Sequence, residues 1–187
     1  MTLKNIFCII FYGIPRKRAK NMVACFIGHR SIQQNEELII SLKESITELI
    51  SKGVTTFLFG SMSQFNELAW NIVSELKITY PFIKRVYVRS SYPYINQFYE
   101  NYLLKSYEET YFPKKIENAG KYSYVERNFE MINRSTFCVF YYNQNYIVSS
   151  IKKPKKDLGL LNNRNSGTKI AYNYALKNNK IIINLYK

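Results

Sequence analysis

The chain has 187 residues, of which 47% are apolar and 16% aromatic, and its formal net charge is +14. This length suits one domain, and the apolar share allows a conventional hydrophobic core. The three cysteines are widely spaced, without a CxxC pair or a Cys/His cluster. That pattern argues against a disulfide framework or a zinc site and favours the reducing cytoplasm. The basic excess predicts attraction to phosphates, nucleic acid and anionic membranes.

The first segment is apolar and then basic. Residues 6–14 form a nine-residue apolar run, and a basic cluster follows it. The run is shorter than the roughly 20 residues of a spanning helix, and a signal peptide would carry its charge ahead of the run. We therefore predict no firm membrane association, with a weak peripheral anchor as the alternative. Met22 is the expected natural start, which would make residues 1–21 an upstream extension of a domain over 22–187.

From Met22 onward, strand-like and helix-like segments alternate. A short apolar run over 23–27 predicts a buried strand that ends at Gly28. Apolar residues at helical spacing over 33–52 predict an amphipathic helix. A β-branched and aromatic run then predicts a second strand at 55–59. The pattern continues, in chain order, with a helix at 63–79, a strand at 83–88, a helix at 93–105, a loop with local turns at 106–121, a helix at 122–134, a strand at 136–142, a long polar loop at 143–166, a helix at 167–178 and a strand at 180–185.

Apolar strands that alternate with amphipathic helices are typical of a parallel sheet with helices on both faces. Right-handed crossovers then favour a doubly wound topology. The predicted fold is therefore α/β, a Rossmann-like doubly wound sheet of about five parallel strands. Ligands of such sheets bind outside the carboxyl ends of the strands, so the turns after the strands are the predicted site.

These turns contain residues suited to an anion. Glycine allows close backbone approach to a phosphate or ribose, and a helix N-terminus presents unpaired N–H groups. Each glycine taken alone is equally consistent with an ordinary tight turn. Three such turns on one edge of a sheet predict a common binding site. The residues concerned are Gly28, His29, Arg30, Gly60, Ser61, Ser63, Ser166, Gly167 and Thr168.

Of four side chains near this edge, three have two interpretations each. His29, the only histidine, is either structural or a hydrogen-bond partner of a phosphate or base. Arg30, the next residue, could pair with phosphate bidentately. Asn66 and Glu67, in the first turn of a predicted helix, either cap that helix or hold a ribose hydroxyl. No metal-ligand motif, Walker A loop, full GxGxxG or GxSxG is present, so no metal or separate cofactor is predicted.

Several motifs in order resemble one family. They are FIGHR at 26–30, FGSMSQFNELA at 59–69, ERNFEMI at 126–132 with Ser135, and SGTxxA at 166–171 with Tyr174 and Ala175. Together they resemble the YpsA-like branch of the SMF/DprA–LOG (SLOG) superfamily of Rossmann-like proteins, over about residues 22–187. The resemblance implies a nucleotide or nucleotide-derived ligand.

The Lonely Guy enzymes of this superfamily cleave the N-glycosidic bond of nucleoside monophosphates. Arg127 with Met131 resembles the arginine motif of these enzymes, which implies a ligand-binding or catalytic role for Arg127. The glycine-rich motif is reduced to residues 166–168, and Ala171 stands where those enzymes have a glutamate. Glycosidic cleavage needs a carboxylate, for which Glu67 or Glu130 would have to substitute.

We therefore expect binding or sensing of a nucleotide-type small molecule. N-glycosidic hydrolysis is the first alternative. Binding of single-stranded nucleic acid is the second, because the chain combines a net charge of +14 with 17 tyrosines. The exposed faces of such an aromatic-rich chain could also support a homodimer.

Overall fold

The structure is a computed structural model that describes residues 21–60, 62–146 and 166–187. Its centre is a six-stranded sheet in the order β4-β3-β2-β1-β5-β6, and every neighbouring pair is parallel. The chain first adds strands on one side of β1, then returns to the middle and adds β5 and β6 on the other. The strands are β1 (Met22–Gly28), β2 (Val54–Phe59), β3 (Lys84–Val88), β4 (Glu109–Tyr111), β5 (Phe137–Tyr141) and β6 (Ile181–Asn184).

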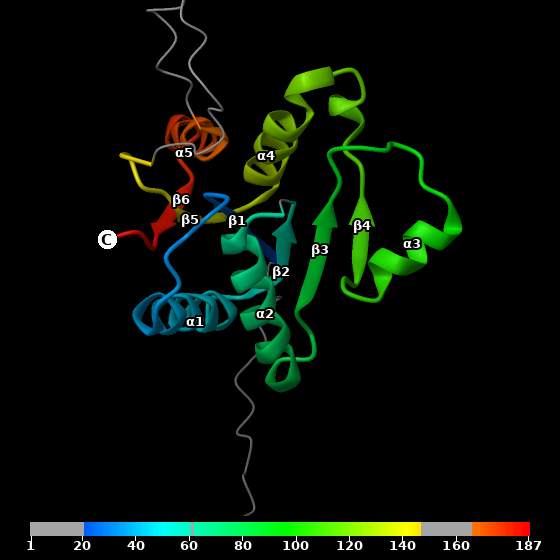
Figure 1. Cartoon of the computed structure of the whole chain (residues 1–187). Helices are drawn as coiled ribbons and strands as arrows, with labels where there is room; N and C mark the ends of the chain where they lie inside the picture. The colour runs from blue at the N-terminus through cyan, green and yellow to red at the C-terminus, as the bar shows by residue number, and fades with distance from the viewer. Residues whose placement is uncertain (1–20, 61, 147–165) are drawn as a thin grey trace, which may run out of the picture.

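Helices cover both faces of the sheet (Figure 1). The first two helices pack on one face, and the last two pack against each other on the opposite face. The third lies beside the edge strand β4, outside both layers. The helices are α1 (Glu36–Ser51), α2 (Gln64–Thr79), α3 (Gln97–Leu104), α4 (Ser123–Arg134) and α5 (Gly167–Lys177), with short 3-10 turns η1 (Lys114–Ile116) and η2 (Gly120–Tyr122).

Alternation along the central strands divides the core into two clusters. Successive side chains of a strand point to opposite faces. In β1, Ala24 and Phe26 therefore pack toward α1 and α2, whereas Cys25 and Ile27 pack toward α4 and α5. All five residues of β5 are buried, as expected for a strand covered on both faces.

The Rossmann-like doubly wound fold predicted from the sequence is confirmed. The sheet has six strands rather than about five, because β4 lies in the segment 106–121 that was predicted as a loop. At three residues, β4 is too short to show an alternating pattern. The predicted extension falls almost entirely in 1–20, and most of the predicted loop at 143–166 falls in 147–165, outside the described residues. Within the described parts of the chain, no helix combines the length and apolar character needed to span a membrane.

Candidate functional site

The change in strand order puts β1 beside both β2 and β5, so the carboxyl ends of these central strands share one edge of the sheet. We call this the carboxyl edge. Gly28, the last residue of β1, is in register with Tyr141, the last residue of β5. The pairing continues one residue further, because the His29 amide donates to the Tyr141 carbonyl at 3.3 Å. In doubly wound folds, ligands bind at such a switch in strand order.

His29 is enclosed at this switch point. Its side chain is buried, and its ring stacks on Tyr146 with centroids 3.8 Å apart and planes inclined by 9°. Nε2 lies 2.9 Å from the amide nitrogen of Asn143, which donates to it when the ring is neutral. Nδ1 is sealed from solvent and has no partner in the described part of the chain. Burial lowers the pKa of His29 below 6.5, although a protonated Nε2 could donate to the Asn143 carbonyl, 3.2 Å away, and this hydrogen bond opposes the shift.

Asn66 links the ends of β1 and β2. Its side-chain nitrogen donates to the Phe26 carbonyl at 3.3 Å, and its oxygen accepts from the Gly60 amide at 3.4 Å. Ser63 caps α2 by accepting from the Asn66 amide at 3.2 Å. The Asn66 side chain also donates to the Ser63 hydroxyl at 3.3 Å. The Asn66 side chain therefore joins two strand ends, and the helix cap itself is Ser63.

Arg127, from the second turn of α4, reaches the ends of β2 and β3. It is only 3% exposed, yet no carboxylate of the described residues lies within 4.0 Å of it. Nη1 donates to the Val88 carbonyl at 3.2 Å, and Nε donates to Asn128 Oδ1 at 3.0 Å. Nη2 has no acceptor among the described residues.

Burial, with no counter-ion among residues 21–60, 62–146 and 166–187, lowers the pKa of Arg127 from 12.5 to about 10. The neighbouring Tyr87 does not neutralise it, because burial raises the pKa of that phenol more than Arg127 lowers it. At neutral pH, the carboxyl edge therefore holds a buried guanidinium charge next to a neutral phenol. Such a charge is costly unless an anion pairs with it.

Two glycines of the predicted site have packing roles. A methyl group on Gly60 would lie 2.6 Å from Arg127 Nη1 and 2.7 Å from Met131 Sδ, so Gly60 makes room for the arginine. A methyl group on Gly28 would lie 2.6 Å from Phe65 Cβ, so Gly28 allows α2 to pack closely on β1. The absent side chain at Gly60 is thus a condition for the position of Arg127.

The N-terminus of α5 also lies on the α4 side of the sheet. Ser166 caps this helix by accepting from the Lys169 amide at 3.1 Å. Helix geometry leaves the N–H groups of Gly167 and Thr168 without intrahelical acceptors. A methyl group on Gly167 would be 4.0 Å from Tyr124, in the first turn of α4. The start of α5 and the first half of α4 are therefore neighbours.

Other predicted residues lie apart from Arg127 or outside the description. Arg30 is exposed, and its carbonyl accepts from the Gln64 amide at 2.9 Å. Glu67 is exposed on α2 and forms no ion pair with Arg127. Ala171 is a residue of α5 and is buried in the core. Ser61 lies outside the described residues.

Sequence reasoning missed Tyr146 and the Val88 carbonyl as parts of this edge. Tyr146 follows the end of β5 by five residues and contacts His29 through tertiary stacking alone. A backbone carbonyl carries no residue-type signal at all. Neither could have been found from motif spacing.

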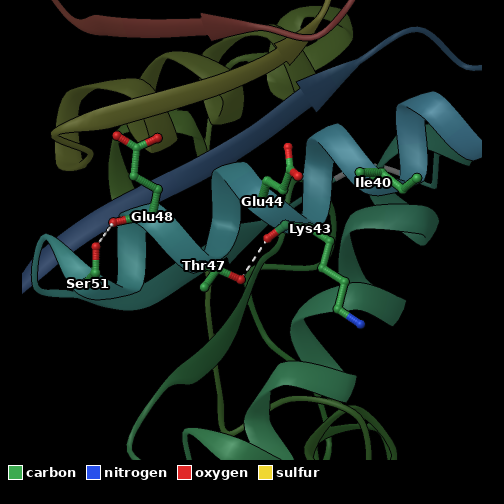
Figure 2. A pocket seen from close by; sticks show the side chains of 6 residues that line it. All are labelled: Ile40, Lys43, Glu44, Thr47, Glu48 and Ser51. Carbon is green, nitrogen blue, oxygen red and sulfur yellow. Dashed lines mark hydrogen bonds between the residues drawn. The ribbon is translucent and has the colours of Figure 1, made fainter.

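A shallow hollow elsewhere on the molecule contains none of the predicted residues. Figure 2 shows it on the outer face of α1, where Lys43, Thr47 and Ser51 project from the helix. The Thr47 and Ser51 hydroxyls donate to carbonyls of their own helix, so they do not converge on a common point. The buried polar side chains described above, His29, Asn66 and Arg127, lie instead at the carboxyl edge. Across residues 21–60, 62–146 and 166–187, no three His, Cys, Asp or Glu side chains are grouped to hold a metal.

Comparison with known proteins does not assign a family. Neither a protein-family model nor a curated protein sequence matches this chain. The candidate site therefore stands on its own geometry: beside Gly60, a buried arginine with no ion-pair partner among the described residues, and an enclosed histidine between β1 and β5.

Proposed function

We propose that the chain binds a nucleotide or nucleotide-derived anion at the carboxyl edge, with Arg127 as the principal phosphate ligand. The observation that carries the proposal is the buried guanidinium that lacks a carboxylate partner among the described residues. A phosphate oxygen at Nη2 would pair this charge and accept charge-assisted hydrogen bonds. The guanidinium is available in charged form, because a pKa of about 10 keeps it protonated at neutral pH.

The setting of Arg127 suits an anion in two further ways. The start of α5, which borders the first turn of α4 at Tyr124, offers N–H groups without intrahelical acceptors and the positive end of a helix dipole. The carboxyl edge of a doubly wound sheet is also the usual ligand position of this fold. His29, neutral at pH 7 and enclosed by Tyr146, fits a structural support of the switch point better than a phosphate ligand.

Thermal melting of the full chain with a nucleotide panel tests the proposal. A ligand at 100 times its dissociation constant stabilises the folded state by about 2.7 kcal/mol, which is a rise in Tm of roughly 5–10 °C. The panel contains adenosine and guanosine mono-, di- and triphosphates, the parent nucleosides and inorganic phosphate. We expect phosphorylated compounds to raise Tm, and nucleosides to have a much smaller effect.

Arg127→Met provides the decisive comparison, because methionine fills similar space without charge. Arg134→Met is the matched control, since Arg134 is an exposed arginine in the last turn of the same helix. The proposal predicts that only Arg127→Met abolishes the shift. Equal shifts in both variants, or no shift with any compound in the wild-type chain, would refute it.

N-glycosidic hydrolysis receives no comparable support from the described residues. Ala171 offers no carboxylate, and Glu67 is exposed without pairing to Arg127. Chromatography of the same incubations for free base measures this activity directly. Binding without release of base is the expected result.

A further inference from the structure

Residues 92–104 expose aromatic side chains at the β4 edge of the sheet. Within α3 only Leu103 is buried, and α3 lies outside both helix layers (Figure 1). Phe98 and Tyr102 are 82% and 61% exposed, and Tyr92 and Tyr94 in the preceding loop are 70% and 85% exposed. We call these four residues the aromatic face. From the structure we infer that the aromatic face is the contact surface for a second copy of this chain.

Hydrogen bonds within the chain fix the backbone of the loop that carries Tyr92 and Tyr94. Arg89, directly after β3, donates from Nη1 to the carbonyls of Tyr92 and Pro93 at 2.6 and 3.3 Å. Tyr92 is thereby kept at a φ of 59°, a left-handed conformation that bulky residues adopt rarely. Phe98 and Tyr102 are four positions apart on α3, so they lie on the same side of the helix. A face with a fixed backbone loses little conformational freedom on association.

The exposed area matches what a dimer needs. An aromatic side chain buries about 150–250 Å² when fully covered, so these four exposed fractions amount to roughly 600 Å². That is at the upper end for a single patch on a monomer, and a standard interface covers about 800 Å² on each partner. The aromatic face would therefore supply most of one side of an interface, with a polar rim around it.

The low net charge around the aromatic face favours a second copy of this chain as its partner. Residues 89–105 contain one acid, Glu100, and two bases, Arg89 and Lys105, so this stretch carries only one net positive charge on a chain whose formal net charge is +14. Two copies repel each other through their basic surfaces, and a face of low net charge is where they can approach. A nucleic acid or an acidic protein would be drawn to the basic surfaces instead.

Sedimentation equilibrium of the full chain at concentrations from 5 to 200 µM, in 0.15 M salt, tests this inference. The expected result is a mass that approaches twice 22.2 kDa as concentration rises. Higher salt should strengthen the dimer, because it screens repulsion between the basic copies. A single species of 22.2 kDa at every concentration and salt level would overturn the inference.

Phe98→Glu, which puts a charge on the aromatic face, should convert the dimer to a monomer across this range. Ile78→Glu is the matched control, because Ile78 is 85% exposed near the end of α2, outside the aromatic face. Both substituted positions are exposed, so circular dichroism should report folded protein for each. A dimer that persists in Phe98→Glu, or one that Ile78→Glu disrupts equally, would assign the contact to another surface and overturn the inference.

Discussion

Replacing Arg127 with methionine should stabilise the protein when no ligand is present. Burial lowers the pKa of Arg127 from 12.5 to about 10, and each unit corresponds to 1.36 kcal/mol between the charged and neutral forms. Holding the charge therefore costs about 3 kcal/mol at neutral pH. The Val88 carbonyl would lose its hydrogen-bond partner, at about 1 kcal/mol. The net expectation is a gain of about 2 kcal/mol, or roughly 4–8 °C in Tm.

Urea unfolding of the wild type, Arg127→Met and Arg134→Met measures this difference. Arg134 lies over the Tyr111 ring at 4.5 Å, so its replacement should instead lose about 0.5–1 kcal/mol. Opposite signs for two arginines of one helix would identify the unpaired charge as the cause. If Arg127→Met lowers the free energy of unfolding by more than about 1 kcal/mol, Arg127 is a structural residue, and the argument for an anion site is refuted.

Three further predictions concern the carboxyl edge. Gly28→Ala should destabilise by about 1–3 kcal/mol through overlap with Phe65, whereas Gly167→Ala, with 4.0 Å of space, should change unfolding by less than about 1 kcal/mol in urea titrations. Because His29 has a folded-state pKa below 6.5, the unfolded chain takes up its proton first. Stability should therefore decline as pH falls through 6.5 toward the folded-state pKa, and His29→Gln should flatten this part of a melting profile against pH. Asn66→Ala should cost about 2–4 kcal/mol by leaving two backbone groups unpaired, and a loss under 1 kcal/mol in urea would show that Asn66 does not join the strands.

The fold could be predicted from the sequence because long periodic segments determine it. Helix α1 repeats apolar side chains at helical spacing, and β5 is apolar throughout, so element type and face followed from local pattern. β4 was missed because three residues are too few to show an alternating apolar pattern, and its strand conformation depends on pairing with β3. The parallel arrangement also gave the correct edge for the turns, since all carboxyl ends of a parallel sheet share one side.

The roles of individual residues at that edge were harder to predict. Gly28 and Gly60 follow the same rule of sequence, a glycine at the end of a strand, yet they make space for different side chains. Gly28 accommodates Phe65, which lies in α2 on one face of the sheet. Gly60 accommodates Arg127, which lies in α4 on the other face and 67 positions further along the chain. Which side chain fills the space depends on how α4 crosses the opposite face of the sheet. That long-range geometry is invisible to motif spacing.

The Asn66 side chain hydrogen-bonds to both parts of the carboxyl edge, the end of β1 near His29 and the end of β2 near Arg127. Its side chain bonds the Phe26 carbonyl, three residues before His29, and the Gly60 amide, which lies under Arg127. A displacement of β2 that opened space at Arg127 would therefore strain the strand that carries His29. This link would help to keep a charge buried that has no counter-ion among the described residues, because Asn66 ties the backbone of β1 to the backbone after β2. Under the proposed function, an arriving anion would recover the energy that burial of this guanidinium costs, so the feature expected to lower the stability of the free chain would also supply affinity for the ligand.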